Sequence, residues 1–149
     1  MDLSAIARLP PVVGLAALGA QRLLSQGSRT SPSSSVVGAV VAASGVAVAA
    51  SGIREIRSAG TTLDPANPTE TTSIVRQGIF RYSRNPIYLG DALVLLGYAI
   101  HRRHLLALIP VVAFVEAMDL GQIPAEEDAL LAHFGSTYGD YVASVRRWF

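Results

Sequence analysis

The sequence predicts an all-α membrane protein with four transmembrane helices, the last two forming a helical hairpin, and a C-terminal interfacial amphipathic helix. Of its 149 residues, 50% are hydrophobic and 15% are charged, and the mean hydropathy is positive at +0.39. Soluble domains carry roughly 25% charged residues. Four apolar stretches, at residues 6–24, 36–53, 87–100 and 105–123, are separated by polar turns. No alternation of strands with helices is visible, so a soluble α/β fold is excluded.

Charge and cysteine content exclude several kinds of function. Twelve basic residues, all arginine, against eleven acidic residues give a net charge of +1. This balance leaves no excess of positive charge to hold a nucleic-acid backbone. The absence of cysteine excludes disulfides, cysteine-ligated zinc, iron–sulfur clusters and thiol catalysis. His101, His104 and His133 have no ligand spacing with acids or with one another, so we expect neither a nucleic-acid partner nor a metal.

The first two apolar stretches are predicted to anchor the protein in the membrane. Residues 6–24 are nearly long enough to cross a hydrocarbon layer of ~30 Å, and Pro10 and Pro11 predict a kink or a late helix start. A cleaved signal peptide, with its cleavage site in the small residues 17–20, is the alternative. Residues 36–53 carry no charge, and small residues recur there at a spacing that allows close helix contact in lipid: Gly38, Ala42, Gly45 and Ala49. We therefore assign residues 1–57 to a two-helix anchor.

The polar loop at residues 60–77 and the arginines around it set the predicted topology. Five arginines cluster here: Arg54, Arg57, Arg76, Arg81 and Arg84. By the positive-inside rule, this loop faces the cytoplasm. The stretch 87–100 extends only about 20 Å as a helix, so it spans marginally or enters as one arm of a hairpin with residues 105–123. An even number of spans then places both termini of this multi-pass protein on the cytoplasmic side of the cell membrane.

The C-terminal segment is predicted to lie at the membrane surface. A helix at residues 125–134 begins after Pro124 with three acids, which suit a first helical turn. Beyond Gly135, aromatic and aliphatic residues recur at helical spacing, with two arginines among them: Tyr138, Tyr141, Val142, Val145, Trp148 and Phe149. This pattern is typical of an interfacial amphipathic helix.

Four motifs follow one another in the second half of the chain. They are Gly-Ile-Phe-Arg-Tyr-Ser-Arg-Asn-Pro-Ile-Tyr-Leu-Gly at 78–90, the hydrophobic hairpin, the acid pair Glu126 and Glu127, and Phe-Gly-Ser-Thr-Tyr-Gly-Asp-Tyr at 134–141. In combination they resemble the isoprenylcysteine carboxyl methyltransferase and phospholipid methyltransferase group of integral-membrane enzymes. The resemblance covers residues 60–149 and implies S-adenosylmethionine as the methyl donor, bound on the cytoplasmic side. Residues 58–149 are then expected to form the donor-binding core of a single structural domain.

The resemblance also implies which residues bind the donor. They lie before and at a glycine, two positions after it, directly after Arg84, and at the first acid of the pair. The residues are Thr72, Ser73, Ile74, Val75, Gly78, Phe80, Asn85, Pro86, Ile87, Tyr88 and Glu126. Glu126 is the natural partner of the donor's ammonium group, and backbone groups near Asn85 suit its carboxylate. Arg84 offers the carboxylate a bidentate fork.

Two positions depart from the family pattern. Asn85 stands where many relatives have histidine, a change that keeps hydrogen bonding but removes a titratable group. Gln122 stands four residues before Glu126, where the carboxyl methyltransferases have an arginine that meets the substrate carboxylate. This difference argues against carboxyl methylation of a prenylated cysteine. We expect Gln122 and Glu116 to lie near the acceptor.

The expected reaction is direct transfer of the methyl group to a lipophilic small molecule or membrane lipid that enters from the bilayer. Because the sulfonium is already activated, catalysis is mostly positioning and exclusion of water. A carboxylate acceptor needs no base, whereas an amine, phenol or thiol would lose a proton to Glu127, Asp91 or Glu116. Arg84, Glu127 and Asp91 are therefore the candidate catalytic residues. Two alternatives are phospholipid amine N-methylation and a non-catalytic membrane scaffold with the same fold.

Several of these residues also have a purely structural interpretation. Arg81 and Arg84 suit anchors at the cytoplasmic surface. The acids after residue 124 suit the first turn of a helix, whose dipole favours negative charge there. Glu116 and Asp119 share one helix face, where the structural interpretation pairs them with Arg76 or Arg81.

Overall fold

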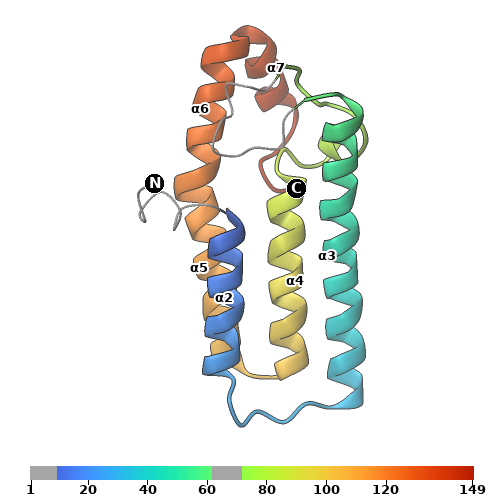
Figure 1. Ribbon diagram of the computed structural model, residues 1–149, viewed down its shortest axis with the longest axis vertical. Coiled ribbons are helices and arrows are strands. Elements are labelled where there is room, and N and C mark those ends of the chain that lie inside the picture. Colours follow the sequence, from blue (N-terminus) through green and yellow to red (C-terminus); the bar gives the residue numbers. More distant parts are fainter. Residues whose placement is uncertain (1–9, 62–71) are drawn as a thin grey trace.

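The computed structural model describes residues 10–61 and 72–149, and every regular element in those ranges is helical. The helices run side by side and form an elongated bundle, which the C-terminal elements cap at one end (Figure 1). The α-helices are α2 (Pro10–Leu24), α3 (Pro32–Ser58), α4 (Pro86–Arg102), α5 (Ile109–Ala117), α6 (Ile123–Phe134) and α7 (Ser136–Ser144). Short turns join them: the 3-10 turns η2 (Gly78–Arg81) and η3 (Leu105–Leu108), and the π turn η4 (Met118–Gln122). The all-helical prediction is confirmed for this part of the chain.

Among the described residues, two helices are long and apolar enough to cross a membrane, and both contain predicted spans. They are α3 and the continuous helix Leu105–Phe134, which includes α5, η4 and α6. With 15 and 17 residues, α2 and α4 are shorter, and the four-span topology stays a prediction. The first described helix, α2, runs from Pro10 to Leu24, and the kink or late start predicted from Pro10 and Pro11 stays a prediction. Residues 6–9 of that stretch and 62–71 of the polar loop lie outside the described residues.

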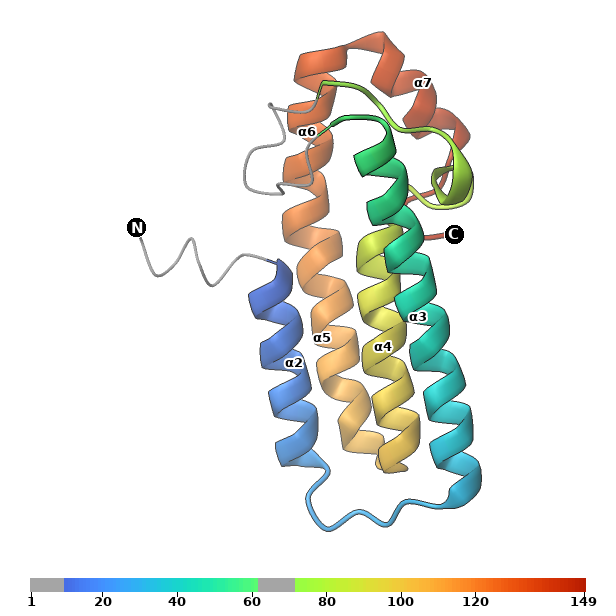
Figure 2. The same cartoon turned by 45° about the vertical axis from the view of Figure 1, so that its right-hand side comes forward.

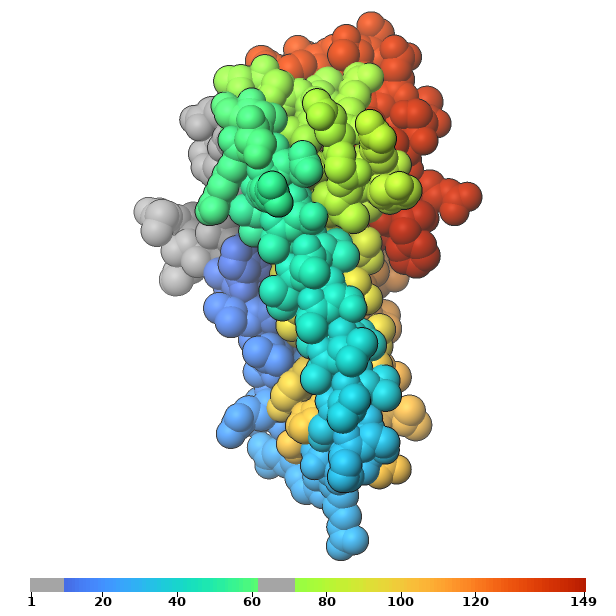
Figure 3. Space-filling view, turned by 90° about the vertical axis from the view of Figure 1, so that its right-hand side faces the viewer, coloured from blue at the N-terminus to red at the C-terminus, as the bar shows by residue number. Residues whose placement is uncertain are grey.

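Glycine permits α3 and α4 to approach each other closely along the stem of the bundle. Gly38, Gly45 and Gly52 recur every seventh residue on α3 and are buried. A Cβ added at Gly45 would lie 2.5 Å from the carbonyl oxygen of Gly90, and one at Gly38 would lie 2.5 Å from that of Gly97. Figure 3 shows α3 running the length of the stem with α4 behind it. The small-residue face predicted from the sequence is thus the contact between the second and third helical stretches.

Buried polar side chains hold the end of the stem that lies away from the cap. Gln21 is fully buried, and its side-chain amide donates to the carbonyl oxygens of Leu95 and Ala107, each over 2.9 Å. Arg102 donates to the hydroxyl oxygen and to the carbonyl oxygen of Ser25. These bonds fix α2 against α4 and against the turn η3.

A π turn carries the last long helix past Pro124 toward the cap. The sequence predicted a span ending at residue 123 and a separate surface helix from residue 125, but the helix is continuous from Leu105 to Phe134. Proline has no N–H to donate, so the carbonyl four residues earlier, at Leu120, loses its usual helical partner. The π turn η4 lies at this point and accommodates the change in spacing.

The last helix, α7, is shorter than the helix predicted from the spacing of the aromatic residues. It ends at Ser144, and Val145 is extended, with φ −127° and ψ 136°. The residues that follow fold back because their carbonyls accept hydrogen bonds from the loop before α4; Asn85 donates its side-chain amide to Arg147 O over 3.1 Å. Figure 2 shows α7 and the C-terminus beside that loop. The helix predicted to continue to Phe149 is therefore replaced by an extended tail.

Candidate functional site

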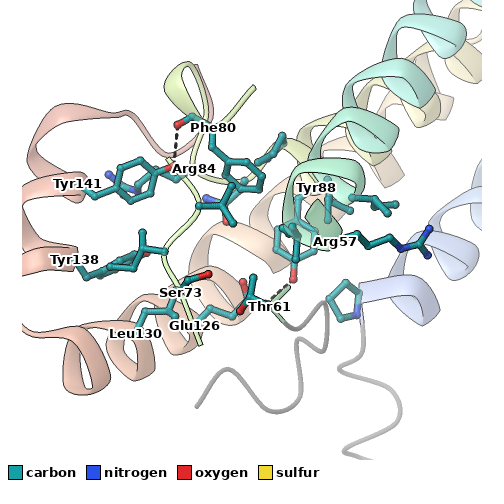
Figure 4. A pocket seen from close by; sticks show the side chains of 18 of the residues that line it. Arg57, Thr61, Ser73, Phe80, Arg84, Tyr88, Glu126, Leu130, Tyr138 and Tyr141 are labelled. Atoms are coloured by element: carbon teal, nitrogen blue, oxygen red, sulfur yellow. Dashed lines mark hydrogen bonds between the residues drawn. The ribbon is translucent and has the colours of Figure 1, made fainter. Parts of the chain in front are cut away.

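A cavity of about 360 Å³ lies at the capped end of the bundle (Figure 4). Small-molecule sites usually measure roughly 300–1,000 Å³. Its walls come from the start of α2, the end of α3, residues 73–75, the segment 80–88, and the facing sides of α4, α6 and α7. Segments from both ends of the sequence therefore converge on one space.

Gly78 begins the turn that brings Phe80 to the cavity wall. Its φ of 56° lies in the left-handed region, and an added Cβ would overlap the carboxylate of Glu55 near the end of α3. Glycine adopts this conformation without strain. The turn η2 begins here and places Phe80, which is 8% exposed, in the cavity wall.

Glu126 is a carboxylate in the cavity that lacks a cationic partner within residues 10–61 and 72–149. Tyr88 donates its hydroxyl hydrogen to Glu126 Oε1 over 2.5 Å, and the side-chain amide of Gln122 donates to the same oxygen over 2.7 Å. Figure 4 shows Tyr88 and Glu126 pointing toward one another. Because both donors are neutral, the negative charge of Glu126 remains available to a cationic ligand.

Glu127, the next residue, is neutralised by two arginines. Arg84 Nη2 lies 2.6 Å from its Oε1, and Arg147 Nη2 lies 2.6 Å from its Oε2. The other terminal nitrogen of Arg84 donates to the carbonyl oxygens of Val142 and Val145, over 2.9 and 2.6 Å. The network ties the loop before α4 to α6 and to the C-terminal tail, and Glu127 is not part of the cavity wall.

The tail is also fixed at the π turn. Arg147 Nη1 donates to Asp119 Oδ1 over 3.1 Å, and the indole N–H of Trp148 donates to the same oxygen over 2.9 Å. Trp148 packs against the buried core as well. Asp119 thus pairs with Arg147, and not with Arg76 or Arg81 as the structural interpretation of the sequence had it.

Two buried polar atoms of cavity-lining residues have no hydrogen-bond partner in the described part of the chain. They are the hydroxyl oxygen of Ser73 and the Nε of Arg84. Buried polar groups without partners are rare in folded proteins and cost free energy. An acceptor oxygen of a ligand that reached either atom would satisfy it.

Tyr138 and Tyr141, interpreted from the sequence as interface aromatics, form part of the cavity wall. Tyr141 donates its hydroxyl hydrogen to Phe80 O over 2.8 Å, and the guanidinium of Arg76 lies 5.6 Å from the centre of its ring. Burial raises the pKa of Tyr138 to about 12 and also raises the pKa of Tyr141. Both hydroxyls therefore stay neutral at physiological pH.

A comparison of the sequence with known protein families agrees with this arrangement of helices. The profile of the phospholipid methyltransferase family matches residues 33–137, which include α3 without its first residue and the elements from η2 to α6. The chain belongs to the phospholipid methyltransferase family. It is accordingly a membrane methyltransferase, and its two long apolar helices agree with a place in the membrane. No curated protein and no solved structure matches it.

Most residues to which the family resemblance assigned donor binding lie around this one cavity. Nine of the eleven line it: Ser73, Ile74, Val75, Phe80, Asn85, Pro86, Ile87, Tyr88 and Glu126. Gly78 lies beside the cavity, and the backbone N–H of Thr72 donates to the hydroxyl of Thr61 over 2.9 Å. The assignment of these residues to a methyl donor stays a prediction for this family member.

The candidate catalytic and acceptor residues are divided between the cavity and its surroundings. Arg84 and Asp91 line the cavity, whereas Glu127 lies outside it. Gln122 contacts Glu126, and Glu116 is exposed on α5 away from the cavity wall. Within residues 10–61 and 72–149, no three histidine or acidic side chains gather in a way that would hold a metal ion.

Sequence reasoning missed one wall of the cavity. Pro10 and Pro11 at the start of α2, and Ile53, Ile56 and Arg57 at the end of α3, all line it. These residues belong to the predicted anchor at residues 1–57. The division of the chain into this anchor and a donor-binding core stays a prediction. The Pro-Pro pair and the charged end of the second span were visible in the sequence, but nothing local indicated that they meet.

Proposed function

We propose that this membrane methyltransferase transfers the methyl group of S-adenosylmethionine to a lipophilic acceptor within the cavity. The observation that carries the proposal is Glu126, a carboxylate held by two neutral donors and left without a cationic partner in the described residues. The donor molecule carries an ammonium group, which forms strong charge-assisted hydrogen bonds with a carboxylate. Membership of the phospholipid methyltransferase family supports methyl transfer to a lipid.

The remaining walls of the cavity suit the other parts of the donor. We assign the carboxylate oxygens of the donor as acceptors for the hydroxyl of Ser73 and the Nε–H of Arg84, which have no partner in the described part of the chain. Because both terminal nitrogens of Arg84 already bind protein groups, we assign its Nε to the ligand in place of a bidentate fork. The rings of Phe80 and Tyr138 and the side chain of Leu130 offer apolar surface for the adenine.

The chain's own residues position the donor and exclude water. When bound, S-adenosylmethionine supplies a methyl group already activated by the positive charge on sulfur. Tyr88 and Gln122 hold the carboxylate of Glu126 in one orientation, so the ammonium is bound in one place. The ion pairs of Glu127 fix the loop before α4, which forms the adjoining wall. Holding the reactants in one geometry within an apolar cavity lowers the barrier.

We further propose a multi-pass topology with both termini in the cytoplasm. It is supported by α2 and α4, which pack along the two longer helices, and by the arginines near the capped end. A reporter fused after Phe149 and one inserted in the loop at residues 60–77 are expected to report the same side of the membrane. Opposite sides would contradict the topology and a donor site built from both segments.

Transfer of a labelled methyl group into lipid tests the proposed activity. Purified protein in detergent is incubated with methyl-labelled S-adenosylmethionine and a panel of lipophilic acceptors, and label is counted in the organic phase. We expect label with the wild type, little with Glu126→Gln, and wild-type transfer with Asp128→Asn, which changes an exposed acid two residues away. A protein that binds the donor but transfers label to no acceptor would instead be the non-catalytic scaffold.

A further inference from the structure

The two hydrogen bonds that hold Glu126 come from two separate elements. Tyr88 lies on α4, shortly after the loop at residues 83–85, whereas Gln122 is the last residue of the π turn η4. Both side chains donate to the same carboxylate oxygen, Oε1. Apolar contacts in the core hold these elements together but are not directional, whereas hydrogen bonds fix orientation. The orientation of the carboxylate therefore depends on how the loop is held against η4.

The extended tail after α7 is bonded to this loop (Figure 2). The carbonyl oxygen of Arg147 accepts hydrogen bonds from the side-chain amide of Asn85, over 3.1 Å, and from the hydroxyl of Ser83, over 3.3 Å. The carbonyl oxygen of Val145 accepts one from Nη1 of Arg84 over 2.6 Å. Three consecutive side chains of the loop thus donate to the backbone of the tail, and two of them, Arg84 and Asn85, line the cavity.

Side chains of the same tail are bonded to η4 and to α6. Nη1 of Arg147 donates to the carbonyl oxygen of Asp119 over 3.2 Å and to its Oδ1 over 3.1 Å. The indole N–H of Trp148 donates to the same Oδ1 over 2.9 Å. Asp119 lies in η4, three residues before Gln122, and the other terminal nitrogen of Arg147 binds Glu127 on α6. Two consecutive residues of the tail together join the loop, η4 and α6.

We infer that Arg147 and Trp148 are positioning residues of the methyl-donor site. They join the loop before α4 to η4, and so keep Tyr88 and Gln122 where both bond to Glu126. The inference rests on the proposed function, in which that carboxylate binds the ammonium of S-adenosylmethionine. Neither tail residue is among the described residues that line the cavity, so they act on the donor without touching it. A carboxylate already held in place needs no ordering when the ligand binds.

Donor affinity in variants of the tail tests the inference. Calorimetry with S-adenosylmethionine compares the purified wild type with Arg147→Ala and with Trp148→Phe, which keeps an aromatic ring in the core but loses the N–H. We expect losses of about tenfold and about threefold, within the range for residues that act on a site from outside it. Arg146→Ala removes the same charge from an exposed neighbour and should bind like the wild type. Wild-type affinity in either folded variant overturns the role of that residue, and an equal loss in Arg146→Ala overturns both roles.

A ligand without the ammonium separates positioning from a general loss of structure. Methylthioadenosine keeps the adenosine and the sulfur of the donor but has neither its ammonium nor its carboxylate. We expect Arg147→Ala and Trp148→Phe to bind this nucleoside as the wild type does, because Glu126 has no cation to bind. Equal losses of affinity for both ligands would show a merely structural role of the tail and overturn the inference.

A double-mutant cycle with Glu126 identifies the group through which the tail acts. In the Glu126→Gln background, Trp148→Phe should lower donor affinity by no more than roughly twofold, because residues that act as one unit are not additive. The full loss in this background would show that the tail acts through another group and overturn the inference. A wild type that binds the donor, with tail variants that bind it equally well, would overturn the role of the tail alone. Failure of the wild type to bind the donor would refute the proposed function itself.

Discussion

Along the stem of the bundle, α3 and α4 touch through backbone atoms and small side chains, whereas at the capped end the chain is held by long charged side chains. In the stem, the carbonyl oxygen of Gly90 leaves no room for a side chain at Gly45. At the capped end, the three ion pairs found in the described residues all involve Arg84 or Arg147. The stem contact thus depends on shape and the capped end on charge. The cavity lies where the two kinds of contact meet.

Two neighbouring acids show how the capped end separates structure from function. Glu127 is used to bind two arginines and holds the C-terminal tail in place. Glu126 faces the cavity with neutral partners only. A carboxylate that is already neutralised has little charge to offer a ligand, so the difference in partners identifies the residue suited to binding.

Adding one methyl group to the stem is the most severe test of the shape-dependent contact. We expect Gly45→Ala to lower the free energy of unfolding by roughly 3 kcal/mol, because overpacking costs about 1–3 kcal/mol and the atom struck is backbone. Thermal unfolding in detergent, followed by circular dichroism, measures the change. The matched control is Gly19→Ala on α2, where nothing lies within 4 Å of the added Cβ. If both variants melt like the wild type, the close contact does not stabilise the stem.

Removing the carboxylate of Glu127 tests the charge-dependent end. We expect Glu127→Ala to cost about 2 kcal/mol, less than the ~3–5 kcal/mol of a fully buried pair, because its side chain is 18% exposed. The only tryptophan, Trp148, lies on the tail that this residue holds, so its fluorescence should shift to longer wavelength. Asp128→Ala, at an exposed neighbour, should change neither property. An unchanged spectrum in Glu127→Ala would show that the tail is held by other contacts.

A smaller effect is expected from the hydroxyl of Tyr88. Tyr88→Phe removes the hydrogen bond to Glu126 and should weaken S-adenosylmethionine binding by about 1 kcal/mol, or roughly fivefold. Tyr82→Phe is the control, since Tyr82 is 71% exposed and does not line the cavity. Equal losses in the two variants would mean that Tyr88 does not orient the carboxylate.

Local patterns were sufficient to predict the helices of this protein. The apolar stretches and the small residues Gly38 and Gly45 indicated helices and a close helix contact, because each pattern depends on residues near one another in the sequence. The π turn before Pro124 and the extended tail after Ser144 were not predictable in this way. The tail bonds to the loop before α4, far away in the sequence, whereas Pro124 by itself is compatible with either a break between two helices or a π turn within one.

The candidate site was predictable where a motif carried it and not where distant segments meet. The motif at residues 78–90 and the acid at 126 indicated most of the cavity lining. The family resemblance assigned Glu126 to the donor, and Glu127 was a candidate catalytic residue, but the sequence did not show that Glu127 is neutralised, because that depends on where Arg84 and Arg147 lie in space. The wall formed by Pro10 and Ile53 could not be predicted either, because these residues are far apart in the sequence and meet only in the folded chain.

Calorimetric titration of S-adenosylmethionine into the purified protein tests the central claim most directly. We expect the wild type and Asp128→Asn to bind the donor alike. Glu126→Ala should bind it more weakly by roughly 1.5–3 kcal/mol, about 10- to 150-fold, the range for hydrogen bonds to a charged group. A folded Glu126→Ala protein with wild-type affinity, or a wild type that does not bind the donor, would contradict a donor site built around Glu126.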